Sequence, residues 1–286
     1  LAPVHNHAHG LALRACKKVI PETTPQVVVF DTAFHQTMPP KAYMFGMPYE
    51  CYEQFHVRKY GFHGTSHRFV SMKYGEVTGK SLEGLNIVSC HLGNGSSITA
   101  IKDGKSVDTS MGFTPLDGII MGTRSGSVDP SAVEFVQNKL GFTPAQMSDY
   151  LNKKSGFLGL SGQFSDNRDI TSAAQQGGKR SQLVTDMLTY EIKKYIGSYT
   201  AAMNGLDVVI FTGGIGENAP EVRKGVCENM EYLGIKLDNS VNDGLKGKLT
   251  KISAPDSKVE VWVIPTNEEL LIARDTLEIT GLDKNA

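Results

Sequence analysis

The chain has 286 residues, of which 40% are hydrophobic and 21% are charged, and its formal net charge is -1. This composition is typical of a globular protein and is long enough for one large domain, or for one domain plus part of another. The nearly neutral charge, without a basic run, argues against a nucleic-acid partner or a membrane-surface partner. Apolar runs such as residues 27–30 and 208–211 are too short to cross a bilayer.

The cysteine pattern bears on the compartment. Four cysteines are scattered along the chain without a Cys-x-x-Cys spacing: Cys16, Cys51, Cys90 and Cys227. This spacing gives little support for a disulfide framework. Reduced thiols are the ordinary state of cysteines in the cytosol. The sequence therefore predicts a cytoplasmic protein with free thiols.

The first predicted elements are a helix and a strand. Residues 11–19 have the pattern of a short amphipathic helix, which Ile20-Pro21 ends. Residues 27–30 are wholly apolar, as in a strand that is covered on both faces. One strand cannot form a sheet, and no earlier segment of this sequence supplies its partners. We therefore expect the chain to lack the N-terminal part of a larger domain.

From about residue 35 the pattern alternates between strands and helices. Strands are predicted over residues 86–91, 97–102, 206–212 and 259–264, and helices over residues 130–140 and 182–204, with a last helix that starts at Thr266. The first two of these strands are joined through Asn94-Gly95, a strong signal for a hairpin turn. The alternation indicates an α/β protein whose sheet is covered by helices on both faces.

A glycine-rich segment, residues 213–218 (GGIGEN), lies between a predicted buried strand and a helix. Backbone N–H groups at such a junction favour a phosphate group or a nucleotide. The segment matches neither the dinucleotide fingerprint nor the Walker A loop. An alternative remains open, in which Asn218 caps the next helix and Glu221 completes a capping box.

Two further loops combine small residues with polar groups. Residues 91–97 (HLGNGSS) could wrap a phosphate chain with their N–H groups and hydroxyls, or could form only a hairpin. Arg124 lies between glycines and small polar residues, from where its planar guanidinium could bind two oxygens of a phosphoryl group in transfer. The alternative for Arg124 is an ordinary surface position.

Acidic side chains and histidines supply the remaining candidates. Asp31 follows the predicted strand at residues 27–30, where α/β folds place ligand chemistry. His63 and His67 are four residues apart at a predicted loop-to-helix junction, and either could be catalytic or structural. Thr266 and Glu269 have the spacing of a capping box, which would leave Glu268 for a hydrated magnesium ion or for the helix dipole alone.

Taken in order along the chain, these strings resemble the acetate kinase family, part of the acetate and sugar kinase, Hsc70 and actin superfamily. The strings are LAPVHN at 1–6, VVVFDTAFHQTMPP at 27–40, RKYGFHGTSH at 58–67, CHLGNGSSITA at 90–100, DTSMGFTPLDG at 108–118, MGTRSGSVDP at 121–130, FTGGIGEN at 211–218 and IPTNEEL at 264–270.

The resemblance implies an α/β fold of the actin-like ATPase (ribonuclease H-like) type, with a complete C-terminal domain and a remnant of the N-terminal one. It implies three parts. Residues 1–34 are the remnant, residues 35–267 are the nucleotide-binding and dimerisation domain, and residues 268–286 are a helix that packs back on the N-terminal domain. A homodimer formed through the C-terminal domain is expected.

The resemblance also implies roles for individual positions. The expected catalytic residues are Arg124, His63, Asp31 and His5. The expected nucleotide-binding residues are His91, Gly93, Asn94, Gly95, Asp166, Arg168, Gly214, Ile215, Gly216 and Asn218. Val4, Phe62 and Pro115 are expected to form the apolar pocket for the substrate's methyl group, and Glu268 is expected to be linked to magnesium.

The activity that the resemblance implies is reversible, Mg²⁺-dependent, in-line phosphoryl transfer from ATP to acetate, which gives acetyl phosphate and ADP. A propionate kinase, and a nucleotide-binding module of the actin and Hsc70 type without an acceptor, remain alternatives. Family members also carry an N-terminal phosphate loop and an Arg that binds the carboxylate, and this sequence has neither. We therefore expect low turnover from this chain alone. Asn167 stands where the family often has an aromatic residue, so this sequence lacks that ring for packing against adenine.

Overall fold

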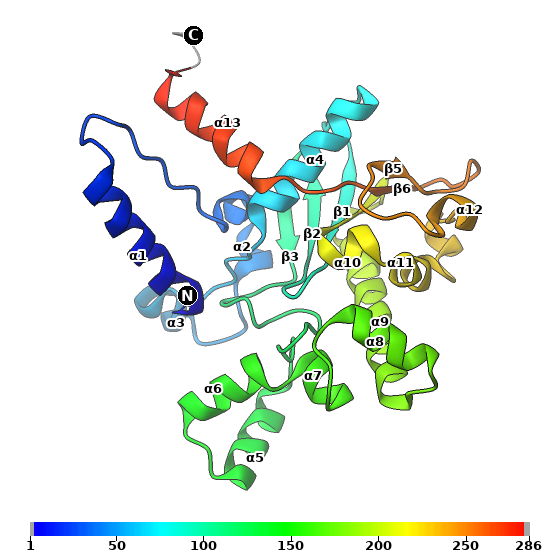
Figure 1. Cartoon of the computed structure of the whole chain (residues 1–286), viewed down its shortest axis with the longest axis horizontal. Helices are drawn as coiled ribbons and strands as arrows, with labels where there is room; N and C mark the ends of the chain where they lie inside the picture. Colours follow the sequence, from blue (N-terminus) through cyan, green and yellow to red (C-terminus); the bar gives the residue numbers. More distant parts are fainter. Residues whose placement is uncertain (1–2, 283–286) are drawn as a thin grey trace.

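The computed structural model describes the backbone of residues 3–282 and the side chains of residues 9–282. In this part of the chain one mixed sheet of six strands has the order β3-β2-β1-β4-β6-β5 (Figure 1). The strands are β1 Asn86–His91, β2 Ser97–Lys102, β3 Lys105–Thr109, β4 Val208–Thr212, β5 Thr250–Lys251 and β6 Glu260–Val263. The strands β1, β4 and β6 are parallel, so their carboxyl ends meet at one edge of the sheet.

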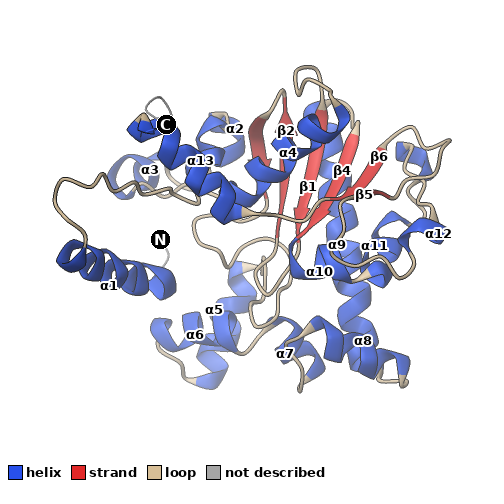
Figure 2. Ribbon diagram, turned by 45° about the horizontal axis from the view of Figure 1, so that its top comes forward, coloured by secondary structure: helices blue, strands red, loops and turns tan. Residues whose placement is uncertain are grey.

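Helices cover both faces of this sheet (Figure 2). On one face the long helix α9 (Lys179–Met203) packs on alternate residues of the central strands, such as Val209 and Phe211. On the other face α4 (Gly64–Thr78) and α13 (Glu268–Thr280) pack on the residues between them, such as Ile210. Burial on both faces explains why β4 is apolar at four of its five positions.

The remaining helices connect and surround this core (Figure 1). They are α1 Pro3–Val19, α2 Pro40–Tyr43, α3 Tyr49–Phe55, α5 Pro130–Leu140, α6 Pro144–Lys153, α7 Gly156–Ser161, α8 Asn167–Gln175, α10 Gly213–Asn218, α11 Pro220–Cys227 and α12 Asn239–Asn242, with 3-10 helices at Ala33–Thr37 and Glu231–Leu233. None of the helices described here is long and apolar enough to span a membrane.

Most of the predicted elements are confirmed. The strands β1 and β2 have the predicted bounds and pair as an antiparallel hairpin. Helix α5 has the predicted bounds too, with Asp129 as its N-cap and Gly141 in a left-handed conformation after its end. The strands β4 and β6 lie inside the predicted ranges.

The predicted strand at residues 27–30 is wrong. These residues form an extended loop in which the side chains of Val28 and Phe30 are 51% and 66% exposed. None of the six strands described above pairs with this loop. An apolar run becomes a strand only where a neighbour completes its hydrogen bonds, and the run has none in this structure. The helix predicted before it at residues 11–19 is confirmed as part of α1, which starts earlier, at Pro3.

The start of the last helix also differs from the prediction. Helix α13 begins at Glu268, and its N-cap is Asn267, whose side chain accepts a hydrogen bond from the N–H of Leu270. The predicted capping box of Thr266 and Glu269 is therefore wrong. Helix α13 packs on α4. The division into residues 1–34, 35–267 and 268–286 stays a prediction.

Candidate active site

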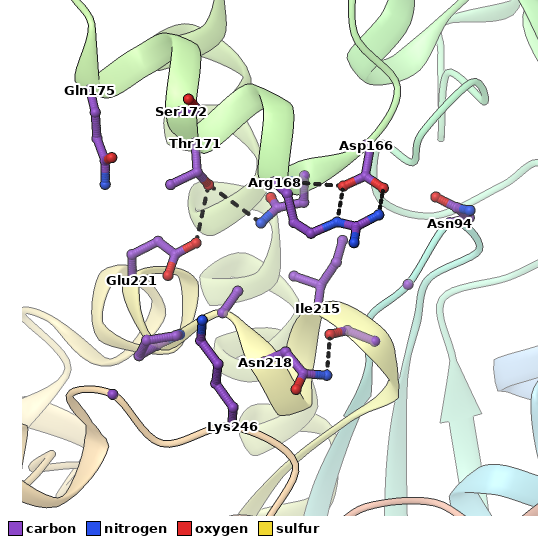
Figure 3. A pocket seen from close by; sticks show the side chains of 16 residues that line it. Asn94, Asp166, Arg168, Thr171, Ser172, Gln175, Ile215, Asn218, Glu221 and Lys246 are labelled. Carbon is purple, nitrogen blue, oxygen red and sulfur yellow. Dashed lines mark hydrogen bonds and ion pairs between the residues drawn. The ribbon is translucent and has the colours of Figure 1, made fainter.

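A cavity of about 750 Å³ opens at the carboxyl edge of the parallel strands (Figure 3). Helix α8, helix α10, the β1–β2 hairpin turn and the loop around Lys246 surround it. Seven of the predicted nucleotide-binding residues line this cavity: Gly93, Asn94, Asp166, Arg168, Gly214, Ile215 and Asn218. Its size is that of a small-molecule site, and its position is that of ligand sites in α/β sheets.

The glycine segment forms a helix and not a loop. Gly213 has φ +77, and a Cβ there would lie 2.7 Å from the carbonyl oxygen of Leu92. The same oxygen accepts hydrogen bonds from the N–H groups of Ile215 and Gly216. Glycine at 213 thus allows α10 to lie directly against the end of β1. A Cβ at Gly214 would meet nothing within 4 Å, which leaves the backbone there open towards the cavity.

The alternative in which Asn218 caps the next helix is wrong. Asn218 Nδ2 donates to the carbonyl oxygen of Gly214, within α10 (Figure 3). The N-cap of α11 is Ala219, without a side-chain cap. Glu221 instead accepts a hydrogen bond from the hydroxyl of Thr171 on α8. Asn218 therefore faces the cavity, and Glu221 helps to hold its two walls together.

The opposite wall starts at the N-terminus of α8. Asp166 caps this helix and also forms an ion pair with Arg168, whose side chain is 89% exposed. The hydrogen bonds from Arg168 hold the pKa of Asp166 below its usual value. Asn167 between them is buried, and its side chain donates to Thr171. Asn167 also lines the cavity, so the position where the family often has an aromatic residue lies at the predicted nucleotide site.

The β1–β2 turn is both a hairpin and a wall of the cavity, so the two interpretations of it do not exclude each other. Ser96 closes the turn, because its hydroxyl accepts from the N–H of Gly93 and donates to the carbonyl oxygen of Gly93. Asn94 lines the cavity, and its Oδ1 would lie 3.4 Å from a Cβ on Gly122. The turn therefore brings Asn94 close to the segment that carries Arg124.

His63 and Arg124 converge beside this turn. A Cβ on Gly95 would lie 3.2 Å from His63 Nε2 and 3.4 Å from Arg124 Nη1. Arg124 is half-buried, and its Nη1 donates to the carbonyl oxygen of Pro115, so an ordinary surface position for it is wrong. Burial lowers the pKa of Arg124, but a guanidinium stays charged in proteins. The pair presents a cation and an imidazole nitrogen to the same space.

The histidines around this point are packed together. His63, with φ 54, is the residue before α4, as the sequence predicted, and its ring stacks on that of His91 at 4.2 Å between centroids. His67 is fully buried and His91 is partly buried. Burial is the main cause that lowers the pKa of both rings, and neighbouring histidines lower it further. His91 also donates from Nδ1 to Ser66, which in turn donates to Thr266.

Asp31 belongs to the same site, although it does not follow a strand. Its Oδ2 accepts a hydrogen bond from the N–H of His63, and its carbonyl oxygen accepts from Gly64. Burial, and then the negative charge of Asp31, raise the pKa of Glu268. Two carboxyl groups from the two ends of the chain are thus close enough to repel each other. Among the described residues no cluster of three or more metal-ligating side chains occurs.

The predicted apolar pocket of Val4, Phe62 and Pro115 stays a prediction. Phe62 is buried against Met111 and Met121. Arg124 links this group to Pro115, because its Nη1 contacts both Met121 Sδ and the carbonyl oxygen of Pro115. The side chains of Val4 and His5 lie outside the described residues.

Sequence reasoning missed several residues at the site. Thr171, Ser172 and Gln175 line the cavity on the same face of α8 as Arg168, and their spacing of three and four residues could have identified them. Lys246 also lines the cavity, but no local pattern marks it. Glu217 is a further case, since its Oε1 accepts from the N–H groups of Gly213 and Thr266 and so joins α10 to the segment before α13.

Comparison with known proteins gives consistent matches over nearly the whole chain. A family model described as the Acetokinase family matches residues 1–274. The acetate kinase of Carboxydothermus hydrogenoformans is 57% identical over 279 residues, which are 98% of this chain and 69% of that protein. The crystal structure of Porphyromonas gingivalis acetate kinase is 49% identical, with a TM-score of 0.93, and the match covers 97% of this chain and 69% of that one.

A propionate kinase from Francisella tularensis is 43% identical, with a TM-score of 0.89, over 95% of this chain and 69% of that one. These structural neighbours confirm the expected fold class, an α/β fold of the actin-like ATPase type.

Proposed function

Because the chain belongs to the acetokinase family, we propose that it phosphorylates acetate with ATP in a reversible reaction that gives acetyl phosphate and ADP. One structural observation supports this proposal. Arg124 and His63 converge on the Gly95 turn, one residue from Asn94, which lines the cavity. A nucleotide in this cavity with its phosphates towards Asn94 has its terminal phosphoryl group beside both side chains.

The chemistry requires positioning more than acid–base catalysis. An acetate oxygen forms a bond to the γ-phosphorus while the bond from that phosphorus to the bridging oxygen breaks, and ADP leaves with the electron pair. Acetate is already an anion, so no strong general base is needed. Arg124 neutralises charge on the equatorial oxygens through its planar fork, and His63 donates a further hydrogen bond.

We propose that Asp31 and Glu268 hold a magnesium ion together with the nucleotide phosphates. Mg²⁺ in kinases is bound by one or two carboxylates, phosphate oxygens and water. Burial is the main cause of the raised pKa of Glu268, and repulsion from Asp31 adds to it; a divalent cation would relieve that repulsion. The ion would supply positive charge to the phosphate oxygens when it is bound.

We propose that the acceptor's alkyl group lies near Phe62 and Pro115, beside Arg124. The similarity to a propionate kinase makes propionate the second candidate acceptor. A homodimer and a cytoplasmic location complete the proposal. The location is supported by the four cysteines, which are all free thiols.

An acyl hydroxamate assay of the intact gene product with ATP and either acetate or propionate tests the proposal. We expect acetate to be phosphorylated, and Arg124→Ala to lower kcat about 100- to 1,000-fold, the effect of losing one donor to transition-state charge. Arg274→Ala is the matched control, because Arg274 pairs with Glu76 between α13 and α4 and should leave the rate unchanged.

An unchanged rate in Arg124→Ala would contradict the mechanism. Binding of MgADP by calorimetry, without hydroxamate from either acid, would instead favour a nucleotide-binding module without an acceptor.

A further inference from the structure

A chain of hydrogen bonds runs from His63 into the interior of the protein. Ser97 Oγ lies 2.9 Å from His63 Nδ1 and 2.7 Å from His67 Nε2. On the far side, His67 Nδ1 lies 2.9 Å from Ser89 Oγ. This series of hydrogen bonds therefore joins the predicted catalytic histidine, His63 at the N-cap of α4, to two strands of the sheet. Ser97 begins β2, and Ser89 lies within β1.

The three residues that follow His63 in this series of hydrogen bonds are fully buried. Ser97, His67 and Ser89 each have an exposed fraction of 0%. The rings of His35 and His91 flank His67 at 6.0 and 6.1 Å between centroids. Burial and these neighbouring histidines lower the pKa of His67 well below its usual value, so its ring is neutral. A neutral buried imidazole carries one proton, which must be on one nitrogen or the other.

Counting the protons in this series of hydrogen bonds leaves two possible donor and acceptor arrangements. A serine hydroxyl has one proton to donate. If His67 donates from Nε2 to Ser97, then Ser97 donates to His63 Nδ1, and a neutral His63 has its proton on Nε2. If His63 instead donates from Nδ1 to Ser97, a neutral His63 has a bare lone pair on Nε2.

Only the first arrangement suits the site. His63 Nε2 faces the Gly95 turn beside Arg124, which is where the proposed function places the transferring phosphoryl group. A proton on Nε2 donates to a phosphoryl oxygen, whereas a lone pair there repels it. We propose that His67 is a positioning residue that acts through Ser97 to keep the proton of His63 on Nε2. This inference rests on the proposed function, and it concerns residues that do not touch the substrate.

Histidine-labelled protein tests the inference directly. The ¹⁵N shifts of neutral His63, assigned by their loss in His63→Gln, report which nitrogen carries the proton. We expect Nε2–H in the wild type and a mixture of both tautomers in Ser97→Ala. A wild-type His63 with its proton on Nδ1 would overturn the inference, whatever the variants show. This measurement needs no activity, so it stands apart from a failure of the proposed function.

Kinetics separate a positioning role from a purely structural one. We expect Ser97→Ala to lower kcat at least about tenfold, as supporting hydrogen bonds to catalytic groups do, with the KM for ATP unchanged. Ser97→Thr, which keeps the hydroxyl, should recover most of the rate. Ser106→Ala is the matched control, because Ser106 is equally buried and also bonds a buried histidine, His35, outside this chain of bonds. Equal kcat losses in Ser97→Ala and Ser106→Ala would overturn the inference.

Discussion

Arg223 allows a prediction that links the stability of the fold to the cavity. Its side chain is fully buried, with an exposed fraction of 0%. Its guanidinium donates to the carbonyl oxygen of Gly216 at 2.9 Å, to Asn242 Oδ1 at 2.8 Å and to the carbonyl oxygen of Leu245 at 2.9 Å. Gly216 is in α10, and Leu245 precedes the cavity residue Lys246. One side chain thus fixes two walls of the proposed nucleotide site.

The loss of stability expected for Arg223→Met can be estimated from these hydrogen bonds. Methionine fills much of the volume but donates no hydrogen bond, so the four oxygens to which Arg223 donates, two of them on Asn242, lose this donor. Each unsatisfied buried group costs about 1–3 kcal/mol. The loss is offset in part, because burial of the guanidinium is itself unfavourable and lowers the pKa of Arg223 to about 10. We expect a net loss of about 3–5 kcal/mol in the free energy of unfolding, the range seen when buried charged networks are broken.

Urea unfolding with an unchanged m-value measures this loss of stability. Calorimetry with MgADP measures the nucleotide affinity of the cavity. We expect a lower unfolding midpoint together with weaker nucleotide binding. Arg180→Met is the matched control, because exposed Arg180 also donates to two backbone carbonyls, those of Leu160 and Gly159. Its loss should cost less than about 1 kcal/mol. The same small cost in Arg223→Met, with nucleotide affinity intact, would refute the reasoning.

Three further predictions concern the site and the buried histidines. Gly95→Ala places a methyl group 3.2 Å from His63 Nε2, so kcat in the hydroxamate assay should fall at least about tenfold while circular dichroism stays unchanged. Glu268→Gln should raise the Mg²⁺ concentration for half-maximal rate about tenfold, and an unchanged magnesium titration would exclude Glu268 from the ion. Burial lowers the pKa of His35 from 6.5 to about 4, so the unfolded chain binds more protons between these values and stability falls as pH is lowered through them. His35 alone should contribute about 3 kcal/mol of this loss, measured as urea midpoints against pH, and a flat profile would contradict it.

The sequence predicted elements best where the determining contacts are local. The hairpin of β1 and β2 was predicted to the residue, because a tight Asn94-Gly95 turn and apolar flanking runs specify it within about 20 residues. The strand predicted at residues 27–30 was wrong. A segment joins a sheet only if a partner strand is available, and a run of apolar residues does not identify that partner.

The two capping predictions failed for a related reason. Thr266 has the spacing of an N-cap, but its N–H donates to Glu217 and its hydroxyl accepts from Ser66, 200 residues away in sequence. Asn218 likewise bonds back to Gly214 within α10. A spacing rule identifies which bonds a side chain could make locally, and a distant partner with better geometry overrides it.

The serines of the HLGNGSS segment show what geometry adds to a correct motif. The sequence suggested that hydroxyls in this turn could wrap a phosphate chain. In the structure Ser96 closes its own turn on Gly93, and Ser97 bonds two histidines. Both hydroxyls are fully buried and already have partners, as buried polar groups must. A phosphate at this turn therefore depends on Asn94, Arg124 and backbone N–H groups, while the serines determine how the turn and His63 are held.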